Sequence, residues 1–143
     1  MNTVAVKDAL RKTVVDSTGI DPVSQIQYPN MVFDPAGKDL WVAEFVPGGD
    51  FSSLSNVRSS CNAFLVQYNF NVPTGKSIDN AERKASAFTD AIPPGTMISC
   101  DGVDCMVRSH KTNISVGKNF SSVMVLVTLF LSAVDKNFIV EKQ

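Results

Sequence analysis

The sequence predicts an α+β domain, with a mainly antiparallel, mixed β-sheet of about four to five strands and two helices packed on one face. Two segments have the apolar spacing of amphipathic helices, and the segments around them alternate with the two-residue period of strands. The order is helix, two strands, helix and three strands. Because short turns join most of the strands, hairpins predominate, which favours an antiparallel sheet.

Composition limits the class of protein. The 143 residues leave room for one domain, residues 1–143, and 44% hydrophobic residues exclude a wholly disordered chain. Thirteen basic and 14 acidic residues give a net charge of −1, so overall charge gives no indication of nucleic-acid binding. Three cysteines without a Cys-x-x-Cys pair argue against a disulfide framework and for a reducing cytoplasm. The longest apolar run is too short to span a bilayer, so we expect no membrane partner.

The first half of the chain begins with a helix. Val6, Leu10 and Val14 lie on one helical face, which predicts a helix over residues 3–17. Glycines and prolines then predict a loop with at most one short strand, residues 25–28. The run DLWVAEFV, residues 39–46, predicts a strand, and residues 47–56 have the composition of a loop. Clean alternation predicts a long strand over residues 58–72.

The second half begins with an amphipathic helix over residues 77–91, in which Asp79 and Glu82 have the spacing of a capping box. Asp101-Gly102 predicts a hairpin over residues 97–107. Its register places Ile98 opposite Cys105 and Cys100 opposite Val103. A final long strand is expected over residues 120–134.

One segment has the setting of a phosphate-binding loop, since Gly75-Lys76-Ser77 lies between a strand and a helix. That loop also needs a glycine five residues before Gly75, where the chain has Phe70, and Pro73 removes a backbone donor. We therefore expect Gly75 to make a turn and Ser77 to cap the helix, with no nucleotide bound.

No other motif predicts chemistry. Cys100, Cys105 and His110 are evenly spaced, but the hairpin register directs both cysteines into the core, and His110 lies among polar residues. His110 is the sole histidine, and no cysteine is expected to be exposed beside it. We therefore expect a protein that is not an enzyme, and assign no catalytic, metal or cofactor-binding residue and no cofactor.

The most informative feature is a surplus of apolar surface on the last strand. Val125, Val127 and Leu129 occupy one face, and Met124, Leu126 and Phe130 the other. A strand that is apolar on both faces needs cover on both, and two helices can cover one face of the sheet. Either the loop at residues 18–38 folds across the second face, or another subunit covers it. Self-assembly is the leading hypothesis from the residues alone.

Several blocks resemble, in order, the bacteriophage tail terminator (tail-completion) family and its small tail-terminator-like members. Residues 28–35, YPNMVFDP, are similar to that family's Asn-x-x-Phe-x-Pro block, and residues 39–47 resemble its first long strand. The strand at residues 62–72, followed by Pro-Thr-Gly and an Ala-rich helix, and Pro94-Gly95 before the hairpin continue the likeness. It spans residues 4–134, and the Ser- and Asn-rich residues 51–62 depart from it.

The resemblance implies a structural virion protein at the head-proximal end of a phage tail, assembled in the host cytoplasm. Members of the family form a homohexameric ring that caps the tail tube, ends its polymerisation and provides the docking surface for the head or neck. The implied partners are other copies of the chain, the tail tube protein and the head-completion or neck protein, with DNA only as cargo passing through the lumen.

Two alternatives remain open, a head-completion or stopper protein at the head–tail joint and a small ligand-binding α+β domain. If the chain is a tail terminator, we expect exposed apolar and basic residues in loops to make the ring or tube contacts: Phe51, Leu54, Arg58, Lys111 and Lys118. Arg108, Lys111 and Lys118 together predict a modest basic loop.

Overall fold

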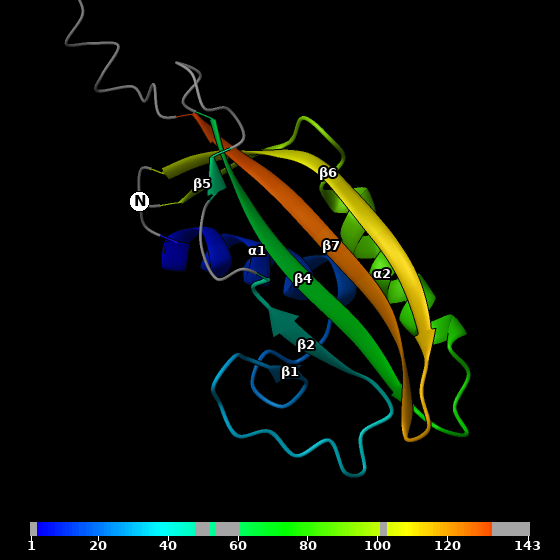
Figure 1. Ribbon diagram of the computed structural model, residues 1–143. Coiled ribbons are helices and arrows are strands. Elements are labelled where there is room, and N and C mark those ends of the chain that lie inside the picture. Colours follow the sequence, from blue (N-terminus) through cyan, green and yellow to red (C-terminus); the bar gives the residue numbers. More distant parts are fainter. Residues whose placement is uncertain (1–2, 48–51, 54–60, 101–102, 133–143) are drawn as a thin grey trace, which may run out of the picture.

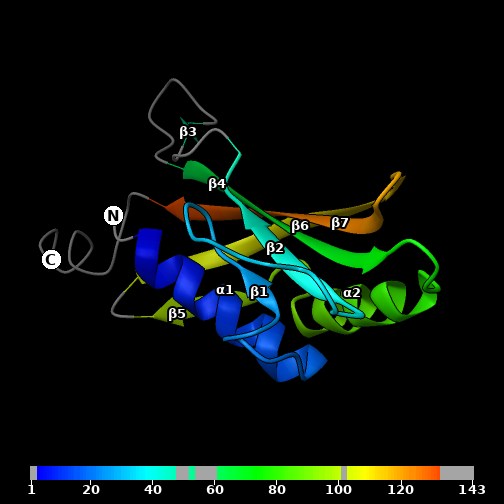
Figure 2. The ribbon, with the colours of Figure 1, turned by 90° about the horizontal axis from the view of Figure 1, so that it is seen from below.

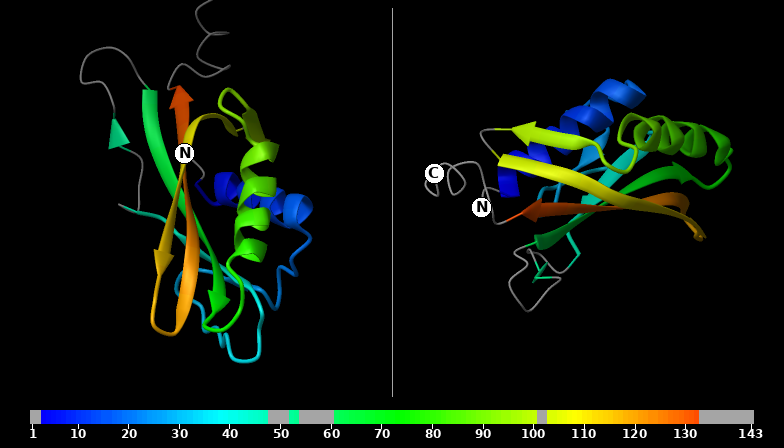
Figure 3. Two further views of the ribbon diagram at one scale, coloured as in Figure 1. Left: turned by 90° about the vertical axis from the view of Figure 1, so that its right-hand side faces the viewer. Right: turned by 90° about the horizontal axis from the view of Figure 1, so that it is seen from above.

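A long, twisted sheet and two helices make up the part of the chain that a computed structural model describes, residues 3–47, 52–53, 61–100 and 103–132 (Figure 1). The first helix, α1, spans Thr3–Thr18, and the second, α2, spans Asp79–Ala91. Both helices lie on the same side of the sheet (Figures 2 and 3). The predicted α+β class, with two helices on one face, is confirmed.

Six strands follow one another across the sheet in the order β1-β2-β4-β7-β6-β5, and β3 pairs with β4 beside this path. Their bounds are Ile26–Gln27 (β1), Trp41–Phe45 (β2), Ser52–Ser53 (β3), Cys61–Pro73 (β4), Met97–Cys100 (β5), Val103–Val116 (β6) and Phe120–Ser132 (β7). β1 and β2 are parallel and the other pairs antiparallel, so the sheet is mixed. The count exceeds the predicted four to five because β1 and β3, of two residues each, are too short to show a period.

The core lies between the helices and one face of the sheet. Alternate residues of β4, including Phe64, Tyr68 and Phe70, are buried on this face, as are Val123 to Leu129 at every second position of β7. The β4–β7 register pairs Phe64 with Leu129 and Phe70 with Val123, so the two buried rows are continuous. The predicted alternation of these strands is confirmed.

The loop between α1 and β2 completes this core rather than covering the other face. Gly19 has a φ of +74° and ends α1, where its N–H donates to the Val15 carbonyl at 2.8 Å. The loop's Ile20 and Ile26, with Leu40 at its end, are buried in the same cluster as the helices. The buried side chains of this loop therefore lie on the helix side of the sheet, which disfavours the alternative in which the loop covers the second face.

Two local predictions are wrong. Asp79 is the first residue of α2 rather than its cap, so Asp79 and Glu82 do not form a capping box; the Asp79 N–H instead donates to Ser77 Oγ at 3.1 Å. β6 does not end at residue 107, because after a bulge between Val107 and Ser109 it stays paired with β7 as far as Val116. The second half of β6 is exposed on both faces, and residues 108–113 are all polar, so this segment lacks the apolar alternation that identifies a strand.

Within the described residues, neither helix has the length and apolarity that a membrane span requires.

Candidate interaction surface

The face of the sheet turned away from the helices, here called the open face, has no helix packed on it among the described residues (Figures 2 and 3). The strand registers place on it the residues that alternate with the buried rows. Half-buried side chains from its two central strands are Leu65, Gln67, Asn69, Met124, Leu126, Thr128 and Phe130. The second apolar face of β7, predicted from the sequence, therefore lies on this surface.

An apolar row crosses the open face near one end of the sheet. Met97 of β5 pairs with Met106 of β6, and Met106 pairs in turn with Phe130 of β7. Met97 is 60% exposed and Met106 37% exposed. Flexible methionine side chains adapt to irregular partners, so this row can pack against another protein surface.

Two basic side chains of β6 lie on the open face beside β7, whereas the acidic Asp104, on the same face of β6, lies toward β5, where Ser99 donates to it. The Arg108 guanidinium carbon lies 4.7 Å from the centroid of the Phe130 ring, which holds the cation over this face. Lys111 is exposed on β6 and pairs with Leu126 of β7, so its stem lies beside apolar surface. Two cations next to apolar side chains favour an acidic and apolar partner.

The other end of the open face is more polar and better packed. Phe120, 43% exposed, lies against Trp41, with ring centroids 5.5 Å apart. Asn71 and Ser122 are buried beside them, and the Ser122 hydroxyl donates to Asn71 Oδ1. The buried polar groups thus satisfy each other.

The structure places two of the five predicted contact residues. Lys111 lies on the open face, whereas Lys118 lies in the turn between β6 and β7, where its carbonyl accepts from Thr74 Oγ1 at 2.8 Å. The predicted basic loop is therefore wrong, because Arg108 and Lys111 belong to strand β6 and only Lys118 is in a turn. Phe51, Leu54 and Arg58 lie outside the described residues.

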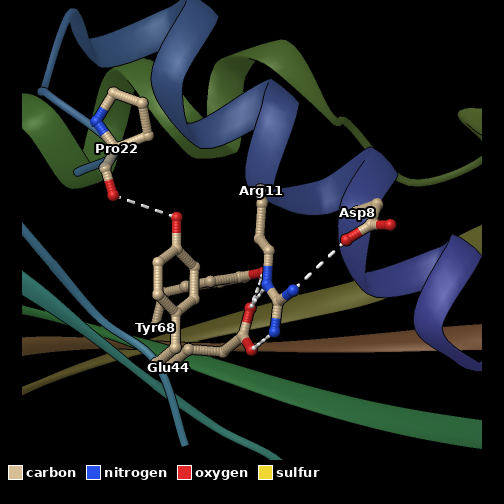
Figure 4. A network of polar contacts seen from close by, with 6 residues as sticks. Asp8, Arg11, Pro22, Glu44 and Tyr68 are labelled. Atoms are coloured by element: carbon tan, nitrogen blue, oxygen red, sulfur yellow. Dashed lines mark hydrogen bonds and ion pairs between the residues drawn. The ribbon is translucent and has the colours of Figure 1, made fainter. Parts of the chain in front are cut away.

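A buried ion pair on the helix side was missed by the sequence reasoning (Figure 4). Arg11 of α1 donates from Nε and a terminal nitrogen to the two Glu44 carboxylate oxygens, at 2.8 and 2.6 Å. Tyr68 Oη also donates to Glu44, at 2.8 Å, and the Glu44 side chain is wholly buried. One signal was available: Glu44 alternates with the buried Val42 and therefore occupies an inward position, where a charge needs a partner.

The surroundings of this pair show that it is structural. The hydrogen bond to Glu44 raises the pKa of Arg11, so the guanidinium stays charged. Burial, with the neighbouring Glu44 carboxylate, raises the pKa of Tyr68 well above its usual value, so the phenol keeps its proton and remains a donor. The arrangement fixes α1 to β2 and β4, with every charged oxygen of Glu44 engaged.

The motifs that the sequence analysis tested have structural roles here. Gly75 has a φ of +95°, as expected for a turn. Ile98 pairs with Cys105 and Cys100 with Val103, so the predicted hairpin register is confirmed. Cys105 is buried, and burial raises the pKa of its thiol to about 11, which leaves it protonated near neutral pH. Within the described ranges, no group of three or more His, Cys, Asp or Glu side chains could hold a metal ion.

An open hollow of about 410 Å³ lies between α1 and β5. It is lined by Asp8 and Lys12 of α1 and by Met97 and Ser99 of β5, among others. Neither His110, the sole histidine, nor the buried Glu44 lines it. The hollow therefore gives no support to the ligand-binding alternative.

Comparisons with known proteins identify the fold. No protein-family model matches the sequence, and a search of curated proteins finds no match. One solved structure, which carries no functional name, is 17% identical with a TM-score of 0.67, over 92% of this chain and 96% of that one. A chain from the virion of a native gene transfer agent (GTA) particle is 14% identical with a TM-score of 0.61, over 90% of this chain and 98% of that one. This chain is thus similar in fold, over nearly its whole length, to a component of a virion particle.

Proposed function

We propose that this chain is a structural virion protein of a phage-like particle. The observation that carries the proposal is the open face, where exposed methionines and two cations lie on the side of the sheet opposite the helices and the core. Large apolar patches on soluble domains mark interaction sites. The similarity of fold to a GTA virion chain supports the same assignment.

Within that class we propose the role of tail terminator: a homohexameric ring that caps the tail tube, stops its polymerisation and presents a docking surface to the neck. A ring forms when one patch of a subunit binds a different patch of its neighbour and the rotation closes. The partners are then other copies of the chain, the tail tube protein and the head-completion protein, with DNA passing through the lumen. The chain performs no catalysis in this role, and it resides at the head-proximal end of the tail.

The first test is the mass of the purified chain, measured by light scattering and analytical ultracentrifugation, with negative-stain microscopy of the same sample. The proposal predicts a closed ring, or a monomer that forms rings on the end of purified tail tubes. A protein that stays monomeric with and without tubes contradicts it.

The second test distinguishes a tail terminator from a stopper. Tail tube protein is polymerised with and without the chain, and tube lengths are measured by electron microscopy. A tail terminator shortens the tubes and is found at one end of each tube. A stopper leaves tube length unchanged and binds the head connector instead.

A further inference from the structure

The loop at residues 29–39, here called the 29–39 loop, carries the single most exposed apolar side chain of the described residues, with a second exposed one beside it. Val32 is 102% exposed and Met31 66% exposed, and Asp34 is exposed beside them. The loop lies beyond the β1–β2 edge of the sheet (Figure 1), and its buried neighbours face the helix side. Its tip is therefore a surface distinct from the open face.

This loop is held in shape at its tip. Asn30 has a φ of +61°, a conformation that asparagine tolerates, and the Met31 N–H donates to the Tyr28 carbonyl at 3.2 Å. Asp34 Oδ1 accepts from the Ala36 N–H at 3.0 Å, which closes the following turn. Met31 and Val32 are thus displayed on ordered backbone, so a partner would bind them with little loss of loop entropy.

The two ends of the 29–39 loop also contact the rest of the domain. The Arg11 guanidinium carbon lies 4.7 Å from the centroid of the Tyr28 ring, and Tyr28 Oη donates to the Pro22 carbonyl at 3.1 Å. At the other end Leu40 is 3% exposed, and Asp39 forms an ion pair with Lys76 at 3.5 Å. Both ends of the loop are therefore fixed to the folded domain.

The open face is complementary to this loop. It offers flexible apolar side chains, Met97 and Met106, beside the cations Arg108 and Lys111. The loop offers two protruding apolar side chains followed by the carboxylate of Asp34. Apolar contact and opposite charge thus occur together on both surfaces.

We propose that the 29–39 loop of one copy docks on the open face of a second copy of this chain. The inference rests on the proposed self-assembly and adds which surfaces make the contact. Because the loop and the open face are different patches of one subunit, the contact is head-to-tail, and each subunit has one free loop and one free face until the ring closes.

A complementation experiment tests the contact. The loop variant carries Met31→Ser and Val32→Ser, and the face variant carries Met106→Gln and Lys111→Glu. Each variant alone should self-associate about 100-fold more weakly than the wild type, since each loses two contact side chains. Mixed at equal concentrations, they should form a 1:1 heterodimer and nothing larger, because one intact loop still meets one intact face.

Matched controls separate the contact from general effects. Val23→Ser removes an 87% exposed valine from the same connection outside the 29–39 loop, and Ile114→Ser removes a 54% exposed residue from β6 on its other face. Arg83→Glu reverses an exposed charge on α2. All three controls should assemble as the wild type does, and circular dichroism should show the same fold in every variant.

A single-atom change tests the charge. Asp34→Asn keeps an oxygen that can accept from the Ala36 N–H and removes only the negative charge, so it should weaken association about two- to fivefold at low salt. In the face variant the same change should instead recover part of the lost association, because it removes the repulsion between Asp34 and the carboxylate introduced at position 111.

Four results would overturn the contact: wild-type assembly by the loop variant, wild-type assembly by the face variant, absence of the heterodimer, or loss of tube binding alone in the face variant. This fourth result would show that the open face binds the tail tube rather than a second copy of the chain. A wild-type chain that stays monomeric even on tubes overturns both the contact and the proposed function. Rings that assemble through this contact but leave tube length unchanged support the contact and overturn the tail-terminator role.

Discussion

The two faces of the same sheet differ in how closely the rest of the molecule packs against them. On the helix side, Tyr68, Phe70 and Val127 are inaccessible and packed against α1 and α2. On the open face, residues one position away along the same strands, such as Leu126 and Gln67, stay half-buried. The comparison indicates that one face determines stability and the other is available for assembly, and each prediction below tests that division.

The largest effect is expected from truncating an aromatic side chain on the helix side. Phe88 of α2 is fully buried against Tyr68 and Phe70, with ring centroids 5.4 and 6.2 Å away. Phe88→Ala should lower the free energy of unfolding by about 3–5 kcal/mol, because it leaves a cavity in the core. Urea denaturation followed by circular dichroism measures the change.

The matched control is Phe120→Ala on the open face, where the side chain is 43% exposed. Its cost should be about 1 kcal/mol, from partial burial and the contact with Trp41. Equal costs at the two positions would contradict the division between the faces.

The second prediction concerns the buried ion pair. Arg11→Met leaves Glu44 charged in a buried site, so it should lower the free energy of unfolding by about 3 kcal/mol. Lys12→Met, one position along α1, breaks an exposed pair with Asp16 and should cost less than about 0.5 kcal/mol. Adding Glu44→Gln to Arg11→Met should recover part of the loss, because the amide oxygen can still accept from Tyr68 without a charge; no recovery would show that the packing of Arg11 dominates.

The same pair shows what sequence reasoning could and could not find. The alternation of β4 and β7 and the single apolar face of α2 predicted the core, because each pattern is local and its period identifies the buried face. Glu44 occupies an inward position of its strand, but Arg11 is 33 positions away and by itself resembles a solvated surface charge. Their partnership depends on how α1 crosses β2, which no local pattern encodes.

The candidate surface was predictable to a similar extent. The apolar second face of β7 followed from the local sequence pattern alone, since Met124, Leu126 and Phe130 occupy positions of the same face. The place of Arg108 and Lys111 did not, because the segment 108–113 is wholly polar and resembles a loop. The display of Met31 and Val32 depends on turn geometry between two prolines, which a hydropathy pattern does not report.

The third prediction is a loss of stability at alkaline pH. In the folded chain the pKa of Tyr68 lies well above its usual value near 10, whereas in the unfolded chain it returns to that value. Above about pH 10 the unfolded state therefore releases a proton that the folded state keeps. The free energy of unfolding should then fall by about 1.4 kcal/mol per pH unit on account of this group.

Tyr68→Phe removes this group and should make the alkaline decline shallower, although it also removes a hydrogen bond to Glu44. Cys105, with its pKa raised to about 11, adds a loss of the same sign as pH rises above about 9, and it is present in both proteins. Urea titrations from pH 8 to 11.5 measure the difference in slope. Identical slopes would show that the Tyr68 phenol ionises in the folded state as readily as in the unfolded one.

The smallest effect is expected on the open face itself. Arg108→Gln removes the cation over the Phe130 ring and should cost about 0.5–1 kcal/mol of stability, as exposed cation–π contacts do. Lys111→Gln should change stability by less than about 0.5 kcal/mol, yet weaken self-association at low salt. Each change removes one positive charge from β6. The difference between their free energies of unfolding, measured by urea denaturation, therefore reports the ring contact of Arg108. The weakening of self-association that both share, measured by sedimentation, reports the charge. If both variants lost stability but assembled normally, the cations would serve the fold of the sheet rather than a partner, and the open face would have to recruit its neighbour through apolar contact alone.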